Sequence, residues 1–185
     1  MEVKPGSSVY IIDDVVSGDF CQTIKTIIDN TNGHIEKYKP GSNVRAKSIT
    51  KSRFENKKFA MMIDNEIYEV VKNVINQITT INPYIAPINS DSGYNLRKIH
   101  GATREHVDGS VCPDKGDPSV RKFSLIIALN GDYEGGEFCF PHQDIKVKLK
   151  KCQAILFPPF WTHPHSTNEL LNDTFRYTIS TWLLE

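Results

Sequence analysis

The stretch that decides the fold is F-R-Y-T-I-S-T-W-L, residues 175–183, near the end of a chain of 185 residues. Successive side chains of a strand point to opposite faces of the sheet. Alternation puts Arg176, Thr178, Ser180 and Trp182 on one face and Phe175, Tyr177, Ile179 and Leu183 on the other. The second, mostly apolar set suits packing against helices or a partner sheet. The first set places an arginine beside a hydroxyl, and a buried arginine is costly unless a carboxylate pairs with it.

Further short strands are predicted upstream, over residues 123–129, 137–140, 145–149 and 154–157. Turn signals at Asn130-Gly131-Asp132 and Gly135-Gly136 separate them. The first half of the chain instead predicts helices after a short apolar strand over residues 9–12. Ser17 offers a cap for one helix, and Asp64 offers a cap for a second with an apolar stripe formed by Ile67, Val70, Val71, Val74, Ile75 and Ile78. Residues 34–57 are polar and predict an irregular surface loop.

Two helices followed by many short strands predict an α+β domain, a double-sheet jelly roll with the N-terminal helices packed on one sheet. The chain has no internal repeat and no linker long enough to split domains. Residues 1–185 are therefore expected to form a single domain, with helical cover over about residues 1–90 and the jelly-roll core over about residues 91–185.

The composition excludes several classes of protein. Twenty-two basic residues balance twenty-two acidic ones, so no overall charge favours nucleic acid or an anionic membrane surface. No apolar run approaches the roughly 20 residues of a membrane span, and the N-terminus has no signal pattern, so we expect a cytoplasmic protein. The four cysteines, scattered without a C-x-x-C pair, predict reduced thiols rather than disulfides. The composition leaves the oligomeric state open.

A candidate metal site begins at His106-Val107-Asp108. In an extended segment the imidazole and the carboxylate point to the same side and could meet one ion. Fe(II) in oxygenases takes two histidines and one carboxylate and keeps open positions. Alone, the motif is also compatible with a plain surface turn through Gly109.

His163-Pro164-His165 could supply the third ligand, since both histidines share a face. Arg176 and Thr178 would then bind the far carboxylate of a dicarboxylate whose keto-acid end chelates iron. Arg176 follows His163 by thirteen positions and His165 by eleven, and one small molecule must span the gap, so the spacing favours His165. His163 would then be a neighbouring, substrate-contacting or lid residue. The alternative for Arg176 is an ion pair with Asp or Glu, or a solvent-exposed edge.

The segment from Tyr94 to the end resembles the 2-oxoglutarate/Fe(II)-dependent dioxygenases, in particular the prolyl 4-hydroxylase-like group. The matching pieces, in order, are H-V-D at 106–108, L-N-G-D-Y-E-G-G-E-F-C-F-P at 129–141, Q-A-I-L-F-P-P at 153–159, H-P-H at 163–165 and F-R-Y-T-I-S-T-W-L at 175–183. The opening Y-I-I-D-D-V-V-S-G-D-F-C at 10–21 is also similar to the N-terminal strand and helix of that group.

The resemblance implies a double-stranded β-helix in which His106, Asp108 and His165 bind iron, while Arg176 and Thr178 hold the C5 carboxylate of 2-oxoglutarate. The implied cofactors are Fe(II), 2-oxoglutarate and O₂, and the family admits ascorbate as well. The implied reaction hydroxylates a C–H bond and releases succinate and CO₂. Two features depart from the family pattern. Arg176 lies eleven rather than ten positions after His165, and His100 or Arg104 stands near the position of the usual 2-oxoglutarate-contacting tyrosine.

The resemblance favours a prolyl or other peptidyl substrate, with residues 34–57 and 109–120 as candidate lids. A free amino acid or small metabolite is the alternative substrate, and a cupin-like module that binds metal or ligand without turnover is the alternative function. Arg176 argues against that module, which has no need of a buried cation one cosubstrate length from the metal. Basic residues expected near the mouth of the site are Arg97, Lys98, Arg104 and Arg121, with Phe160 and Trp161 as candidate apolar neighbours.

Overall fold

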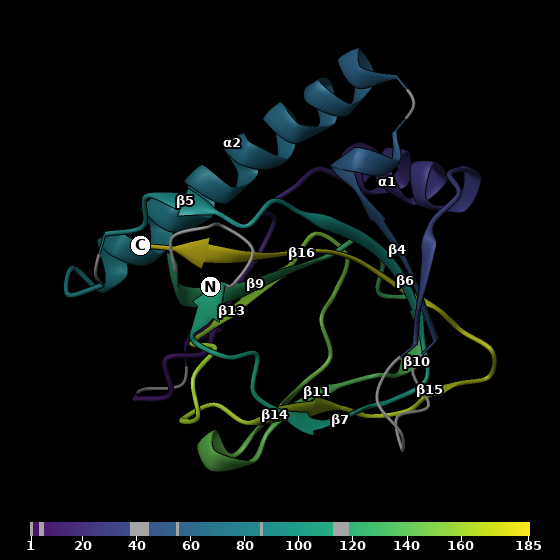
Figure 1. Ribbon diagram of the computed structural model, residues 1–185. Helices are drawn as coiled ribbons and strands as arrows, with labels where there is room; N and C mark the ends of the chain where they lie inside the picture. Colours follow the sequence, from purple (N-terminus) through teal and green to yellow (C-terminus); the bar gives the residue numbers. More distant parts are fainter. Residues whose placement is uncertain (1, 4–5, 38–44, 55, 86, 113–118) are drawn as a thin grey trace.

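A computed structural model describes residues 2–3, 6–37, 45–54, 56–85, 87–112 and 119–185. Its described strands form a large sheet, a second sheet of four strands and a small two-stranded sheet. The large sheet and the four-stranded sheet lie opposite each other, and the helices lie on the far side of the large sheet (Figure 1). The predicted jelly roll of short strands is therefore present.

The large sheet is built around the C-terminal strand, β16. Its strands run in the spatial order β1 (Glu2–Val3), β2 (Tyr10–Ile12), β13 (Ala154–Phe157), β9 (Ser119–Ala128), β16 (Arg176–Leu184), β6 (Asn95–His100), β4 (Arg45–Thr50) and β3 (His34–Lys37). Two short strands extend it, β5 (Ser90–Asp91) beside β16 and β8 (Val111–Cys112) beside β9. All these pairings are antiparallel.

The four-stranded sheet lies opposite and has the order β12 (Ile145–Val147), β11 (Phe138–Phe140), β14 (His165–Thr167) and β7 (Thr103–His106). Apolar side chains fill part of the space between the two layers. They are Val9, Ala128, Phe138, Phe140, Leu149, Ile155 and Phe157, each at most 2% exposed. Short 3₁₀ turns lie at Lys51–Arg53 and Pro141–Gln143.

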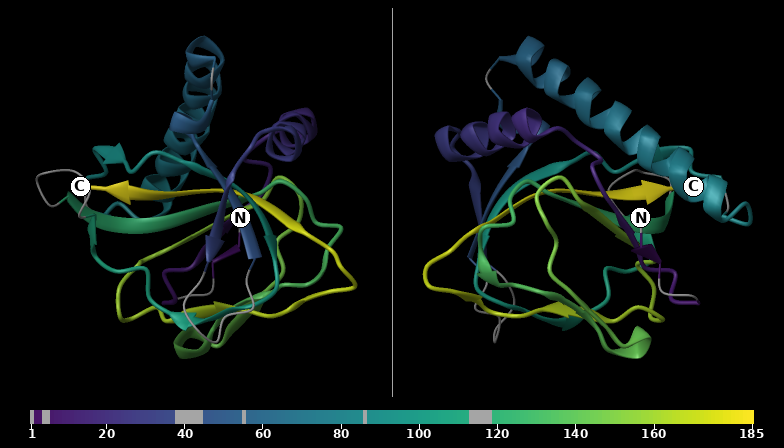
Figure 2. Two further views of the ribbon diagram at one scale, coloured as in Figure 1. Left: turned by 45° about the vertical axis from the view of Figure 1, so that its right-hand side comes forward. Right: turned by 180° about the vertical axis from the view of Figure 1, so that it is seen from behind.

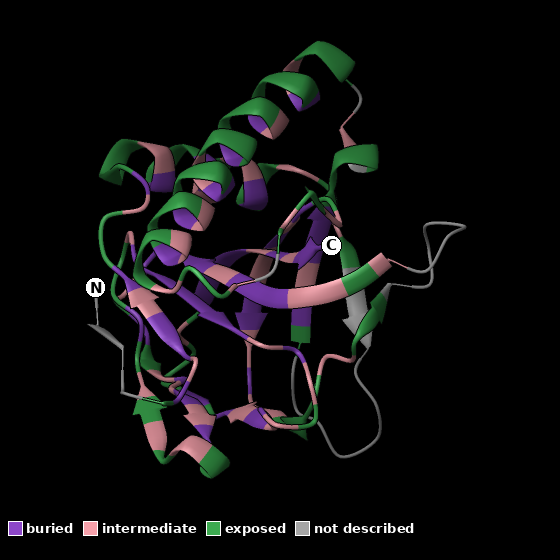
Figure 3. Ribbon diagram, turned by 90° about the vertical axis from the view of Figure 1, so that its left-hand side faces the viewer, coloured by how far each residue is buried: buried purple, intermediate pink, exposed green. Residues whose placement is uncertain are grey.

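Two helices, α1 (Gly18–Asn30) and α2 (Lys57–Ile81), lie over the large sheet, as the two views in Figure 2 show. The Ser17 side chain caps α1 as predicted, because its hydroxyl accepts a hydrogen bond from the amide of Phe20 at 3.1 Å. The stripe on α2 is likewise present, with Ile67, Val71, Val74 and Ile78 buried. Figure 3 shows this buried stripe turned inward while the outer face of α2 is exposed.

One large apolar cluster joins the helices to the sheet. It includes Ile24 and Ile28 of α1, the buried stripe of α2, and residues of four strands of the large sheet: Leu96, Leu125, Ile127, Leu156, Tyr177, Ile179 and Leu183. The last three come from the face of β16 that its alternation predicts to be apolar. Burial of this cluster gives β16 one dry face and leaves its opposite face for the space between the sheets.

The prediction of an irregular loop over residues 34–57 is wrong where the chain is described. Residues 45–50 form β4, which pairs with β6 inside the large sheet, and Ala46 and Ile49 are fully buried. The polar composition conceals this strand because Lys47 reaches across to α1, where its ammonium group donates to the carbonyls of Ile28 and Asp29 at the helix end. This segment is therefore not a lid there, and residues 38–44 lie outside the described part of the chain.

The predicted start of the second helix is also wrong. The helix begins seven residues before Asp64, and its cap is Asn56, whose side chain accepts a hydrogen bond from the amide of Phe59 at 3.1 Å. Asp64 lies inside the helix and pairs with Lys51. Lys57 and Lys58 open the helix, where positive charge is unfavourable for the helix dipole, and the first turn has no acidic residue, so charge does not mark the start.

The structure bears on two predictions from composition, the state of the cysteines and the presence of a membrane span. Cys21, Cys139 and Cys152 carry free thiols, and the side chain of Cys112 lies outside the described part. Within the described residues, no helix has the length and apolar character needed to cross a membrane.

The two-stranded sheet, β10 (Glu134–Gly135) and β15 (Leu170–Leu171), depends on glycine. Gly135 has φ +67°, and a Cβ there would lie 2.1 Å from the carbonyl oxygen of Glu169. The next residue, Gly136, also has positive φ, and its carbonyl accepts a hydrogen bond from Arg176. The predicted Gly135-Gly136 turn thus brings a backbone acceptor to a buried cation.

We predict that Gly135→Ala destabilises the protein more than Gly93→Ala does. Gly93 has φ +77°, but no atom lies within 4 Å of the place that an added methyl group would take, so its substitution costs only the left-handed conformation, about 1–2 kcal/mol. Gly135→Ala adds a clash with backbone, worth about 1–3 kcal/mol more. Urea unfolding of both variants measures the difference, and equal losses would show that the β10–β15 contact does not constrain the fold.

Candidate active site

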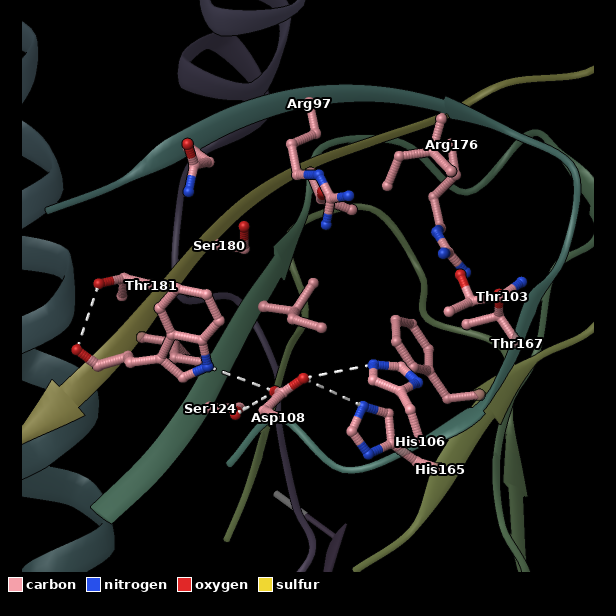
Figure 4. Close-up of a pocket in the computed structure, with 17 residues that line it drawn as sticks. Arg97, Thr103, His106, Asp108, Ser124, His165, Thr167, Arg176, Ser180 and Thr181 are labelled. Atoms are coloured by element: carbon pink, nitrogen blue, oxygen red, sulfur yellow. Dashed lines mark hydrogen bonds and ion pairs between the residues drawn. The ribbon is translucent and has the colours of Figure 1, made fainter. Parts of the chain in front are cut away.

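A cavity of about 260 Å³ lies between the two large layers. Its polar wall is formed by Asn95, Arg97, Thr103, His106, Asp108, Ser124, His165, Thr167, Arg176, Thr178, Ser180, Thr181 and Trp182. The predicted site face of β16 lines it: Arg176, Thr178, Ser180 and Trp182 all contribute. Figure 4 shows the labelled side chains converging from strands of both sheets.

His106, Asp108 and His165 meet at one end of this cavity. His106 ends β7, His165 begins β14, and the two residues are cross-strand partners, which brings their ring centroids to 4.4 Å. Asp108 follows just beyond β7, and its Oδ1 lies 3.3 Å from Nε2 of His106 and 3.8 Å from Nε2 of His165. One ligand atom from each residue lies within 4.8 Å of the others, and among the described residues no further His, Cys, Asp and Glu cluster has this property.

Backbone carbonyls fix the orientation of both imidazoles. Nδ1 of His106 lies 2.9 Å from the carbonyl oxygen of Arg104, and Nδ1 of His165 lies 3.1 Å from that of His163. Because a carbonyl oxygen only accepts, each Nδ1 carries a proton in this arrangement, and each Nε2 faces Asp108. His165 is also packed against the rings of Phe140 and Phe157. The donor set is thus preorganised around one point.

The charge states of Asp108 and His165 favour metal binding. Burial by itself would raise the pKa of Asp108, but hydrogen bonds from His106 and Ser124 and the nearby charge of His165 outweigh burial and lower that pKa to about 2. Burial lowers the pKa of His165, while the bond to Asp108 raises the pKa of His106. Near neutral pH the carboxylate is therefore ionised and His165 is neutral, the forms that bind metals.

Arg176 lies at the other end of the polar wall and is only 3% exposed. Its Nη1 donates to the Gly136 carbonyl at 2.7 Å, and its guanidinium carbon lies 4.7 Å from the centre of the Phe138 ring. Burial lowers its pKa to about 10, so it stays charged near neutral pH. Within the described residues no carboxylate pairs with Arg176, and its Nε has no hydrogen-bond partner. The expected alternatives, an internal ion pair or an exposed edge, are not found there.

The other predicted candidates lie elsewhere. His163 is buried but turned away from the cavity, because Nδ1 contacts the Thr162 hydroxyl and Nε2 lies 2.8 Å from the carbonyl oxygen of Ser7. Nδ1 of His100 lies near the carbonyl of Thr174, and Arg104 is exposed. Neither residue lines the cavity, so neither takes the place of the tyrosine that contacts 2-oxoglutarate in the family. Arg97 and Thr103 face the cavity there instead.

Of the residues expected near the mouth of the site, some contact the site and others lie away from it. Lys98 pairs with Asp29 on the outer side of the sheet, at 2.8 Å, and Trp161 is 80% exposed. Neither Trp161 nor Phe160 lines the cavity. Arg121 instead contacts the site, because its Nη1 donates to the backbone carbonyl of Asp108 at 2.7 Å.

Sequence reasoning misses a group that donates a hydrogen bond directly to a predicted metal ligand. Ser124 donates to Oδ2 of Asp108 at 2.5 Å and is 3% exposed. A usable signal is present, because Ser124 is the single hydroxyl in the otherwise apolar run from Phe123 to Leu129. A polar residue in a buried strand needs a partner, and here the partner is the carboxylate.

A family model matches the part of the chain that forms this site. The model of the 2OG-Fe(II) oxygenase superfamily matches residues 94–184, which contain every residue of the polar wall. Residues 94–184 belong to the 2OG-Fe(II) oxygenase superfamily. The protein is thus a 2-oxoglutarate-dependent Fe(II) dioxygenase, and its cofactors are Fe(II), 2-oxoglutarate and O₂.

Solved structures share the fold along almost the whole chain. A viral collagen prolyl hydroxylase from Paramecium Bursaria Chlorella virus-1, in complex with 2OG, matches with TM-score 0.67 and 16% identity over 97% of this chain and 96% of that one. A prolyl hydroxylase of Trichoplax adhaerens matches with TM-score 0.68 and 14% identity over 97% and 84% of the two chains. A prolyl-4-hydroxylase of Pseudomonas putida gives 0.65 and 12%, over 97% and 94%. The search of curated protein sequences gave no match.

The two histidines of H-P-H provide a direct test of the site. We predict that His165→Ala abolishes binding of Mn(II) as a substitute for Fe(II), because it removes one of three ligand atoms. His163→Ala should retain Mn(II) binding and lower the unfolding temperature, because it removes the bond to Ser7. Titration calorimetry and thermal unfolding measure the two effects, and the reverse pattern would show that the distal ligand is His163.

Proposed function

We propose that His106, Asp108 and His165 bind Fe(II) and that Arg176 and Thr178 bind the C5 carboxylate of 2-oxoglutarate, for hydroxylation of a prolyl or other peptidyl residue with release of succinate and CO₂. The observation that carries this proposal is the buried guanidinium of Arg176, which shares one cavity with the three ligand atoms. A cation in that place fits a ligand that carries a carboxylate at one end and binds metal at the other.

The residues present fit both groups. Two imidazole nitrogens and one carboxylate are the ligand set that Fe(II) takes in oxygenases with open positions. Arg176 has an unpartnered Nε, and Thr178, the next residue along the same face of β16, is 1% exposed and offers a hydroxyl. A guanidinium and a hydroxyl side by side match the oxygens of one carboxylate. A cupin-like module that only binds metal gives no reason for this buried cation.

Each protein group has a defined task in the proposed reaction. Iron with 2-oxoglutarate and O₂ supplies the oxidising chemistry when bound. The imidazoles and Asp108 orient the metal through preformed contacts, while Arg176 and Thr178 set the direction of the cosubstrate. Apolar neighbours such as Phe138 and Ile126 line the same cavity and exclude water from it.

The proposed substrate enters from the end of the cavity opposite Arg176. Arg176 and Thr178 are buried, whereas Asn95, Arg97 and Trp182 on the same wall are half-buried. Trp182 lies six positions after Arg176, which corresponds to roughly 20 Å along β16. An open polar end beyond the cosubstrate suits an extended peptide. The Trichoplax prolyl hydroxylase with the related fold was solved with a peptide fragment of hypoxia inducible factor.

We further propose that the whole chain acts as one dioxygenase domain in which the N-terminal helices support the large sheet. The helices pack against the face of β16 opposite to Arg176 and Thr178. A rigid sheet keeps those two groups at a constant distance from the metal ligands on the other sheet. A cosubstrate that binds at both ends can be positioned only if this distance is fixed.

A screen of succinate release tests the substrate class. We expect that Fe(II)-loaded protein converts 2-oxoglutarate to succinate faster with proline-containing peptides than with free amino acids, and that mass spectrometry finds one added oxygen per succinate. The Asp108→Ala variant is the control for turnover by free iron. Stimulation by free amino acids alone would favour the metabolite hydroxylase instead.

A second prediction concerns the cation. Arg176→Lys keeps the charge but loses the planar fork, so we expect the KM for 2-oxoglutarate to rise about 10–100-fold, with Mn(II) affinity unchanged. Steady-state kinetics and metal titration separate the two quantities. An unchanged KM would place the cosubstrate carboxylate elsewhere.

A further inference from the structure

The two carboxylate oxygens of Asp108 have different partners. Oδ1 points to the imidazole nitrogens of His106 and His165, at 3.3 and 3.8 Å. Oδ2 points the other way, where it accepts hydrogen bonds from the Ser124 hydroxyl at 2.5 Å and from the indole N–H of Trp182 at 3.3 Å. Figure 4 shows dashed lines leaving Asp108 on both sides. One oxygen is thus available to a metal, and the other is already occupied.

The two donors come from neighbouring strands in register. Ser124 on β9 and Trp182 on β16 are directly paired, so their side chains reach the same oxygen from adjacent positions. Arg121 stacks on the face of the Trp182 ring, and its guanidinium carbon lies 3.8 Å from the ring centre. The same guanidinium donates to the backbone carbonyl of Asp108 at 2.7 Å. The sheet therefore holds the indole and the carboxylate in a fixed mutual position.

The geometry points to Ser124 and Trp182 as positioning residues that restrict Asp108 to binding the metal through Oδ1 alone. This inference rests on the proposed ligand set. A carboxylate can bind a cation through one oxygen or through both. An octahedral ion with three protein ligands has just enough positions left for a chelating cosubstrate and O₂. A second oxygen from Asp108 would occupy a position that the keto acid needs, and two hydrogen bonds to Oδ2 oppose that rotation.

A purely structural role would be different. A buried carboxylate oxygen needs hydrogen bonds in any fold, so the two donors could stabilise the protein without affecting the metal. The two roles differ in what they do to 2-oxoglutarate. Loss of positioning weakens 2-oxoglutarate binding only when metal is bound, because only then does Asp108 compete with the keto acid. Distortion of the cavity weakens it with or without metal.

The experiment measures the Kd of 2-oxoglutarate by anaerobic titration calorimetry, for metal-free protein and for protein saturated with Mn(II). The variants are Trp182→Phe, which keeps an aromatic ring but removes the N–H donor, Ser124→Ala, and the double variant. Ser124→Thr keeps the hydroxyl and should restore binding. Trp161→Phe is the matched control, since Trp161 is the other tryptophan of the chain, is 80% exposed and does not line the cavity.

We expect the Kd of 2-oxoglutarate for the Mn(II)-loaded protein to rise about tenfold in each single variant and about a hundredfold in the double variant, since removal of groups that orient metal ligands costs about 10–100-fold in metal affinity or activity. The Kd of metal-free protein, and both values for Trp161→Phe, should stay within about twofold of the wild type. The single variants keep the test decisive if the double variant does not fold.

Two results would overturn the positioning role. In one, the single variants bind 2-oxoglutarate as the wild type does when loaded with Mn(II). In the other, metal-free and metal-loaded protein lose affinity equally, which assigns Ser124 and Trp182 to cavity shape. A different failure, in which Mn(II) does not improve 2-oxoglutarate binding even in the wild type, contradicts the proposed ligand set itself.

Discussion

A single strand with two differently buried faces holds this protein together. β16 lies between β9 and β6 in the large sheet, so its backbone is paired on both sides. One face contributes Tyr177, Ile179 and Leu183 to the apolar cluster under the helices. The other face brings Arg176 and Thr178 into the cavity. A shift of register by one residue would turn Arg176 and Thr178 into the apolar cluster and the apolar side chains of β16 into the cavity. Core packing and site geometry therefore impose the same register.

The parts of the fold that sequence predicts well are those whose pattern reflects burial. Periodicity predicts β16, β13 and the stripe of α2 because apolar side chains dominate their buried faces. It does not predict β4, whose stability comes from pairing with β6 and from Lys47 at the end of α1, because neither contact leaves an apolar pattern. The start of α2 is misplaced for a related reason, since Asn56 caps a helix whose first residues are lysines.

The candidate site shows the same division. His106, Asp108, His165 and Arg176 can be proposed from sequence because their types and spacing carry chemical information, and the structure brings them to one cavity. Ser124 and the contact between Trp182 and Asp108 depend on pairing of β9 with β16, a relation between distant segments that spacing does not encode. Sequence ranks His165 above His163 only by distance along the chain. The structure adds a physical reason for His165, because both nitrogens of His163 are engaged away from the cavity.

The buried charge of Arg176 links binding to stability. A guanidinium that is 3% exposed loses most of its hydration, and the Gly136 carbonyl and the Phe138 ring replace only part of it. The lowered pKa of Arg176 is the sign of that remaining cost. A carboxylate ligand would satisfy the Nε–H group and neutralise the charge in one step, so it would bind the folded state alone. Such a ligand stabilises a fold by about 2.7 kcal/mol at a hundred times its Kd. The buried arginine is therefore a cost to the folded chain that a bound carboxylate would offset, and the same cost favours an anion in this cavity.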